Sequence, residues 1–151
     1  MKRNFLIALF LLFISSCTTL DVFEKTKIFS THEWSAKETP TFTFEIKDTN
    51  SAYNIYYVLR HEDAYRYKNI WVNISMKAPD TSINFRREFI LADNTKWLGT
   101  AMSDIIEHRA TFNPVATKLK KGTYTFTLQQ DMREEPLQYI LATGIRVEKA
   151  K

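Results

Sequence analysis

Cysteine is nearly absent from this chain of 151 residues, which contains a single one, Cys17. One cysteine excludes an intrachain disulfide, a thiol redox pair and a metal site built from several thiolates. Glycine is scarce too, because Gly99, Gly122 and Gly144 are the three in the chain and stand far apart. Isolated glycines exclude the glycine-rich loops that bind phosphate groups. The sequence therefore lacks the common motifs of redox, zinc and nucleotide-binding proteins.

Recognisable catalytic patterns are missing as well. His32, His61 and His108 form no metal-binding spacing, and no GxSxG motif is present. The adjacent carboxylates Glu62–Asp63 and Glu134–Glu135 are typical of solvated loops, whereas a hydrolase needs two carboxylates that converge across a cleft. We therefore name no catalytic residue, and we predict no bound metal and no cofactor apart from a covalent lipid; a hydrolase stays an alternative only if two carboxylates converge in a cleft. His108 is predicted to be a core residue.

The excess of positive charge is small. Lysine and arginine total 21 against 17 aspartates and glutamates, for a formal charge of +4, and two of the cations, Lys2 and Arg3, precede the apolar segment at the start of the chain. No basic stripe follows, so we exclude nucleic acid as a partner.

The N-terminal segment has the pattern of a secretory signal. Phe5–Ile14 is a run of ten apolar residues, shorter than the roughly 20 that a membrane-spanning helix needs. Ile14-Ser15-Ser16-Cys17 then resembles a lipobox, in which the cysteine is acylated and becomes the first residue of the mature chain. We predict a lipoprotein signal peptide over residues 1–16, a lipidated tether over 17–21 and one folded domain over 22–151, with palmitate-type acylation at Cys17.

The tether determines where the domain is held. Two or three acyl chains on Cys17 anchor a protein to a bilayer almost permanently. Thr18 is not the aspartate that retains lipoproteins at the inner membrane of enteric bacteria, and no acidic run follows that resembles a surface-export signal. The predicted location is the periplasmic face of the outer membrane.

Beyond the tether, apolar residues recur with a period of two, and no segment has the spacing of an amphipathic helix. This alternation is typical of half-buried strands, and turn-forming residues fall between the segments. The predicted strands cover 41–46, 53–60, 70–77, 83–91, 106–112, 123–128 and 145–147. Seven or eight short strands at this spacing predict an all-β fold, an antiparallel two-sheet β-sandwich that is either immunoglobulin-like or jelly-roll-like. The long connections over 60–70 and 129–143 favour the jelly-roll-like form.

One connection between predicted strands is unusually rich in aromatic and charged residues. The segment from Arg60 to Trp71 has this composition, which is common in protein-binding hot spots and in sugar-binding platforms. The candidate partner-binding residues are Arg60, Tyr65, Arg66, Tyr67, Trp71 and Trp97. The alternative is that Tyr65, Tyr67 and Trp97 cap the end of the core. An exposed, flat Trp71 or Trp97 in a groove would favour sugar, and a convex apolar patch would favour protein.

Several of these segments also resemble the gliding motility lipoprotein GldH family of the Bacteroidetes, in order along the whole mature chain. The matching segments are Tyr53–Tyr56, Leu59–Arg60, Tyr65–Trp71, Leu91–Asp93, Lys96–Gly99, Gly122–Thr125, Met132–Arg133 and Thr143–Glu148. In one place the chain departs from the family pattern, because Thr100–Ser103 stands where a glycine-rich stretch is expected.

The resemblance implies a non-enzymatic accessory of the gliding apparatus and of the associated type IX secretion machinery, with other envelope proteins as partners. It supplies no catalytic residues. The alternative function is a carbohydrate-binding lipoprotein involved in polysaccharide capture.

Overall fold

The computed structural model describes residues 22–151 and consists of strands and connecting loops. The predicted signal peptide and tether, residues 1–21, lie outside the described residues. Within residues 22–151, no helix has the length and apolarity that crossing a bilayer requires.

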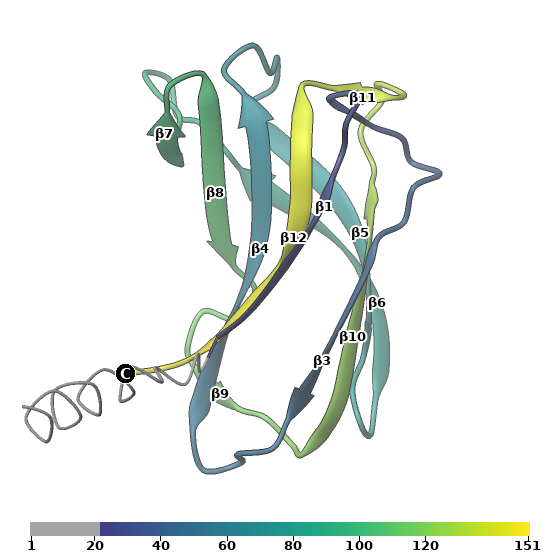
Figure 1. Cartoon of the computed structure of the whole chain (residues 1–151), viewed down its shortest axis with the longest axis vertical. Helices are drawn as coiled ribbons and strands as arrows, with labels where there is room; N and C mark the ends of the chain where they lie inside the picture. Colours follow the sequence, from purple (N-terminus) through teal and green to yellow (C-terminus); the bar gives the residue numbers. More distant parts are fainter. Residues whose placement is uncertain (1–21) are drawn as a thin grey trace, which may run out of the picture.

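Two antiparallel sheets pack face to face (Figure 1). In the first sheet the strand order is β1 (Val22–Ile28), β12 (Ile140–Lys149), β4 (Ala52–Glu62), β8 (Ile105–Thr111) and β7 (Thr100–Met102), and β9 (Thr117–Lys118) pairs with the start of β4. In the second sheet the order is β3 (Thr41–Ile46), β10 (Gly122–Gln130), β5 (Asn69–Lys77) and β6 (Ser82–Ile90). The short strands β2 (Glu33–Trp34) and β11 (Leu137–Gln138) pair with each other.

The connectivity is that of a jelly roll. The first half of the chain pairs with the second half in reverse order, as β1 with β12, β3 with β10, β4 with β8 and β5 with β6. The chain is thus one long antiparallel hairpin, with the β5–β6 turn at its tip, wrapped into two sheets. The predicted jelly-roll-like sandwich is confirmed.

The core consists of the inward side chains of both sheets. Strand β3 shows the simplest pattern, since Phe42, Phe44 and Ile46 are buried and the threonines between them are exposed. Rings from opposite sheets meet in the middle, for example Tyr57 and Phe89 with centroids 4.3 Å apart. Each predicted strand segment forms all or part of a strand, to within one residue at its end.

Two features of the first sheet differ from the prediction. Strand β1 was not predicted, because it is an edge strand on which Lys25 and Lys27 face solvent, so its sequence lacks an apolar face. Strand β12 is much longer than the predicted 145–147, because it lies between β1 and β4 and its residues from Ala142 to Ile145 are buried on both faces. A strand covered on both sides does not alternate in polarity.

The strands run along the long axis, so every connection lies at one of two ends (Figure 1). We call the upper end in that view the loop end, and it comprises residues 28–40, 61–69, 90–105 and 130–140. We call the lower one the turn end, and it comprises residues 46–52, 77–82, 112–122 and 148–151. Strand β4 runs from one end to the other.

Candidate functional site at the loop end

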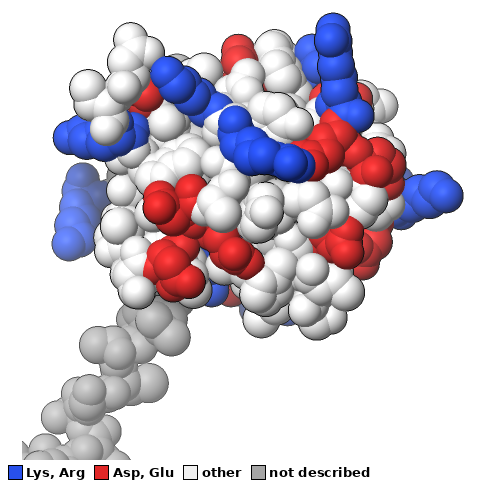
Figure 2. Space-filling model, turned by 90° about the horizontal axis from the view of Figure 1, so that it is seen from above, with Lys and Arg blue, Asp and Glu red and all other residues white. Residues whose placement is uncertain are grey.

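Two loops at the loop end are joined through their backbones; Figure 2 looks onto this end. One loop connects β4 to β5 over residues 63–68, and the other follows β6 over residues 91–99. The amides of Leu91 and Ala92 both donate to the carbonyl of Lys68, at 2.7 and 3.1 Å. The two loops therefore form one surface, although residues 69–90 separate them in sequence.

The second loop is a tight hairpin closed by a bridge between Ala92 and Trp97. Asp93 Oδ1 accepts hydrogen bonds from the amides of Thr95 and Lys96 and from the Thr95 hydroxyl, at 2.7 to 2.8 Å. These bonds, with the Thr95 amide first, lower the pKa of Asp93 below its usual value. The hairpin is fixed by its own Asx turn, and it places the Trp97 indole over the core.

Three of the predicted site residues come together here. Tyr65 lies 5.6 Å from Tyr67 and 6.4 Å from Trp97 between ring centroids. Tyr65 is 4% exposed and donates its hydroxyl to the carbonyl of Asn69, whereas Tyr67 and Trp97 are half-buried. Trp97 also donates Nε1–H to Asp63 Oδ1 at 2.6 Å. Tyr65 thus caps the core, while Tyr67 and Trp97 present part of their rings to solvent.

A pair of buried histidines supports this aromatic cluster from below. His61 Nε2 and His108 Nε2 lie 2.9 Å apart, and His61 Nδ1 lies 2.7 Å from the carbonyl oxygen of Glu62. Since a carbonyl only accepts, His61 donates from Nδ1, and its Nε2 accepts from His108. The Trp97 ring meets His61 edge-on, with centroids 4.5 Å apart.

Both histidines are held in the neutral form. Burial lowers the pKa of His61, and burial together with the neighbouring His61 lowers the pKa of His108 to about 4. The predicted core position of His108 is confirmed at 5% exposure. Its pairing with His61 was not predictable, because it depends on the register of β4 against β8, in which Leu59 lies opposite His108.

The joined loops enclose an open hollow of about 370 Å³. Its walls combine aromatic rings with charges of both signs, from Asp63, Tyr65, Arg66, Tyr67, Lys68, Ala92, Asp93, Thr95, Lys96 and Trp97. Arg66 extends to an ion pair with Glu134 and lies 5.9 Å from the Tyr139 ring. Among residues 22–151 no group of three histidine, cysteine or acidic side chains is placed to hold a metal ion. The chemistry that this surface offers is recognition, through aromatic contact and surface charge.

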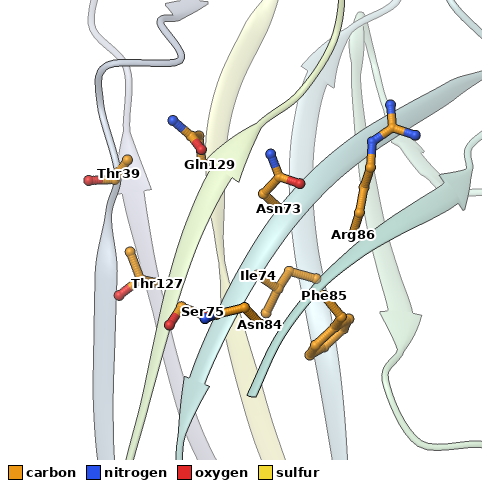
Figure 3. A pocket seen from close by; sticks show the side chains of 9 residues that line it. All are labelled: Thr39, Asn73, Ile74, Ser75, Asn84, Phe85, Arg86, Thr127 and Gln129. Atoms are coloured by element: carbon orange, nitrogen blue, oxygen red, sulfur yellow. The ribbon is translucent and has the colours of Figure 1, made fainter. Parts of the chain in front are cut away.

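Trp71 is a candidate residue that lies apart from this cluster. It belongs to the outer face of the second sheet, where the Arg86 guanidinium covers its ring at 3.9 Å from the centroid. Next to it, the sheet face carries a hollow of about 470 Å³ that sequence reasoning missed (Figure 3). Its lining is mostly neutral and polar: Thr39, Asn73, Ile74, Ser75, Asn84, Phe85, Arg86, Thr127 and Gln129. The polar residues at the outward positions of 70–77 and 123–128 are visible in the sequence. The sequence does not reveal that these two strands are neighbours, so the hollow between them could not be predicted.

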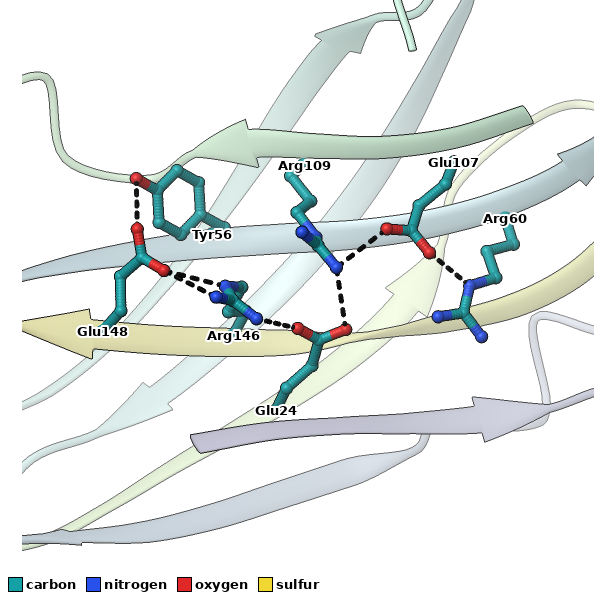
Figure 4. A network of polar contacts seen from close by, with 7 residues as sticks. All are labelled: Glu24, Tyr56, Arg60, Glu107, Arg109, Arg146 and Glu148. Atoms are coloured by element: carbon teal, nitrogen blue, oxygen red, sulfur yellow. Dashed lines mark hydrogen bonds and ion pairs between the residues drawn. The ribbon is translucent and has the colours of Figure 1, made fainter. Parts of the chain in front are cut away.

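Arg60 lies on the opposite side of the molecule, in an ion-pair network on the outer face of the first sheet (Figure 4). Its Nε contacts Glu107 at 2.6 Å, and Glu107 in turn contacts Arg109 at 3.0 Å. The network continues through Glu24 of β1 to Arg146 and Glu148 of β12. Arg60 therefore links strands and does not face the hollow between the loops.

The comparisons with known proteins identify the family. The family model described as GldH lipoprotein matches residues 21–147. The chain is 26% identical to "Gliding motility lipoprotein GldH homolog" of Christiangramia forsetii, with 99% of both chains covered. It is 25% identical to "Gliding motility lipoprotein GldH" of Flavobacterium johnsoniae, with 98% of this chain and 97% of that protein covered.

Among solved structures, an infectious bursal disease virus VP2 subviral particle aligns with 83% of this chain and 32% of the viral chain, at 12% identity and a TM-score of 0.37. A likeness this weak supports no conclusion about fold or function. The family match extends over nearly all of the described domain and ends within β12. The chain belongs to the GldH lipoprotein family.

Proposed function

We propose that this chain is a lipid-anchored, non-enzymatic component of the envelope machinery for gliding motility and associated type IX secretion. Acylated Cys17 holds it on the periplasmic face of the outer membrane, and the loop end binds another envelope protein. The observation that carries this proposal is the family match across residues 21–147, together with the names of the two relatives. The lipobox at Ile14–Cys17 supports the anchor.

The loop end is the surface we assign to partner recognition. Tyr67 and Trp97 expose part of their rings beside Arg66, and aromatic residues with arginine carry most of the binding energy in many protein interfaces. Of the three candidates Tyr65, Arg66 and Tyr67 in the loop between β4 and β5, Tyr65 is structural because it is 4% exposed. Tyr67 and Arg66 are therefore the proposed contact residues.

In-cell photocrosslinking tests this assignment. A photoreactive phenylalanine analogue replaces Tyr67, and as a matched control it replaces the exposed Thr43 on the second sheet. We expect an adduct with an envelope protein from position 67 and none from position 43, identified by mass spectrometry of the purified lipoprotein. Adducts from position 43 alone would place the partner on the sheet face and contradict the proposed site.

Alanine variants separate binding from folding. Tyr67→Ala and Arg66→Ala are expected to reduce partner recovery by an amount equivalent to about 2 kcal/mol while the melting temperature moves by a few degrees at most. Tyr65→Ala should lower stability first, since it empties a buried aromatic position. Loss of recovery only in proportion to lost stability in all three variants would make this loop a scaffold.

A second candidate function, capture of a neutral polysaccharide, is favoured by one observation on the sheet face. Asn73, Ser75 and Asn84 point into the hollow of Figure 3, and their side chains have no hydrogen-bond partner within residues 22–151. Free amide and hydroxyl groups suit sugar hydroxyls. The evidence for an aromatic platform that stacks on a sugar ring is weaker, since Arg86 covers one face of Trp71.

Affinity electrophoresis in gels that contain neutral polysaccharides tests this candidate. Retardation that is lost in Asn73→Ala/Asn84→Ala but kept in Tyr67→Ala would support it. Equal migration in gels with and without polysaccharide would remove it.

A further inference from the structure

The two ends of the sandwich carry opposite charge. The turn end has seven lysines against three carboxylates: Lys47, Lys77, Lys118, Lys120, Lys121, Lys149 and Lys151, with Asp48, Asp80 and Glu148. The loop end has five cations against nine carboxylates: Lys37, Arg66, Lys68, Lys96 and Arg133, with Glu33, Glu38, Glu62, Asp63, Asp93, Asp104, Asp131, Glu134 and Glu135. Figure 2 shows acidic side chains over much of the loop end. The domain therefore has a positive and a negative pole.

The proposed lipid anchor joins the domain at the positive pole. Val22, the first residue of β1, pairs with Glu148, next to the last residue of β12. The four residues from Thr18 to Asp21 span at most about 14 Å when fully extended. Strand β4, which runs from one end to the other, has 11 residues and a length of roughly 33 Å. A membrane that holds Cys17 is thus close to the turn end, whereas the loop end is farther away than the tether can reach.

Much of the positive charge at the turn end is free to meet a partner. The side chains of Lys77, Lys118, Lys121 and Lys151 are exposed and form no ion pair or hydrogen bond within the described part of the chain. The others are partly neutralised, since Lys120 pairs with Asp80 and Lys149 with Asp48. Val115 is 72% exposed at the same end, in a loop that the Asn113 side chain holds by donating to the Val115 carbonyl at 2.8 Å. An exposed apolar side chain at the same end as these lysines suits a lipid surface, where phosphates meet acyl chains.

We propose that the turn end docks on anionic phospholipid headgroups of the same bilayer that holds Cys17, through Lys77, Lys118 and Lys121, with Val115 at the same end. This inference rests on the proposed anchor. Each lysine close to an anionic surface shifts the ratio of docked to undocked domain by about fivefold, and salt screening confines the effect to roughly 10 Å. The lysines of the turn end therefore contribute, and the acidic loop end is repelled.

Docking in this orientation has a consequence for the loop end. The domain stands upright on the membrane, and Tyr67 and Arg66 face away from the lipid toward the partner. The anchor alone holds the domain near the bilayer but leaves it free to tilt. The lysines of the turn end, by binding the headgroups, fix the orientation of the domain relative to the bilayer.

Quenching of tryptophan fluorescence by brominated lipids measures this orientation directly. Trp34, Trp71 and Trp97 are the three tryptophans of the chain, and all lie at or next to the loop end. The substitution Val115→Trp adds a reporter at the turn end, in a position exposed enough to accept it. The acylated full-length mature protein is reconstituted in vesicles of brominated phosphatidylcholine, with or without phosphatidylglycerol.

We expect the reporter at position 115 to be quenched more strongly on vesicles with phosphatidylglycerol than on neutral ones, and the three native tryptophans to be unaffected. The variant Lys77→Gln/Lys118→Gln/Lys121→Gln should reduce the docked to undocked ratio by about a hundredfold and abolish the difference. Its matched control, Lys37→Gln/Lys68→Gln/Lys96→Gln, makes the same charge change at the loop end and should leave quenching intact.

Four outcomes overturn the inference. Equal quenching of the reporter at position 115 on neutral and anionic vesicles would mean that the lysines do not orient the domain. Quenching of the native tryptophans would mean that the loop end also contacts the membrane. Equal loss in both lysine variants means that only net charge matters. In cells, a photocrosslinker at position 115 should form an adduct with lipid. An adduct with a protein instead would mean that the turn end binds a protein partner. Mass spectrometry of the purified protein separates the two proposals, because absence of acyl chains contradicts the anchor itself.

Discussion

The Nε2 atoms of His61 and His108 lie 2.9 Å apart beneath the loop end, in a region where both side chains are at most 5% exposed. Two neutral imidazoles can share one hydrogen bond at this distance, whereas two imidazolium ions would repel each other. The geometry thus excludes a doubly protonated pair, and burial, which lowers both pKa values, favours the neutral state. The aromatic cluster above the pair is coupled to that state through the contact between Trp97 and His61.

This pair predicts that stability falls as the pH drops from 7 toward 4. The pKa of His108 is lowered to about 4 in the folded state from about 6.5 when unfolded, so the unfolded chain binds more protons in this window. The free energy of unfolding should decrease by up to about 3 kcal/mol between these limits. Urea denaturation at pH 7, 6 and 5 measures it, with His108→Gln as the variant that cannot be protonated. An unchanged pH slope in His108→Gln would contradict this explanation.

The alternation in β5 predicts a contrast between neighbouring positions. Ile74 is 2% exposed and Asn73 is half-buried on the outer face. Ile74→Ala is expected to cost about 2 to 4 kcal/mol because it empties a packed site, and Asn73→Ala under about 1 kcal/mol. Thermal or urea denaturation of both variants provides the comparison, and equal losses would mean that the two faces of β5 do not differ in packing.

The close contacts around Gly144 predict that a methyl group added at this position destabilises the first sheet. A Cβ at this position would lie 2.2 Å from the Lys25 carbonyl oxygen and 2.7 Å from Thr26 Cγ2 on β1. Gly144→Ala should therefore cost about 3 kcal/mol, as overpacking does at its upper range, and displace β1. Hydrogen exchange should show lost amide protection in β1 and retained protection in β3 of the other sheet. Protection of β1 equal to that of the unaltered protein would show that the sheet accommodates the methyl group.

Cys17 predicts how the protein is held on the membrane. Cys17→Ala should leave the chain uncleaved by the lipoprotein signal peptidase and unlabelled by radioactive palmitate. Ser16→Ala keeps a small residue before the cysteine and should be labelled normally. Palmitate incorporation in Cys17→Ala at the level of the unaltered protein would end the interpretation of Ile14–Cys17 as a lipobox.

The alternating pattern of the sequence determined the strands and the fold class. In β3, β5 and β10 apolar side chains face the core and polar ones face outward, except for Trp71 on the outer face of β5 and the buried Gln130 of β10, so a period of two is visible in the residues themselves. Short strands separated by turn residues then leave few arrangements besides a two-sheet sandwich. Strand β1 was not predicted, because an edge strand needs no apolar face. Only part of β12 was predicted, because a central strand is apolar on both faces and does not alternate.

Only the tertiary structure decided which of the candidate residues lie together. Tyr65, Tyr67 and Trp97 meet because the loops after β4 and β6 share backbone hydrogen bonds at Lys68, a long-range contact that no local spacing encodes. Arg60 and Trp71 occur in the same sequence segment but point to the outer faces of opposite sheets, since the chain crosses from the first sheet to the second between β4 and β5. The separation of charge between the ends also arises from the folding of the chain, which brings lysines of three distant connections and of residues 148–151 to the same end of the sandwich.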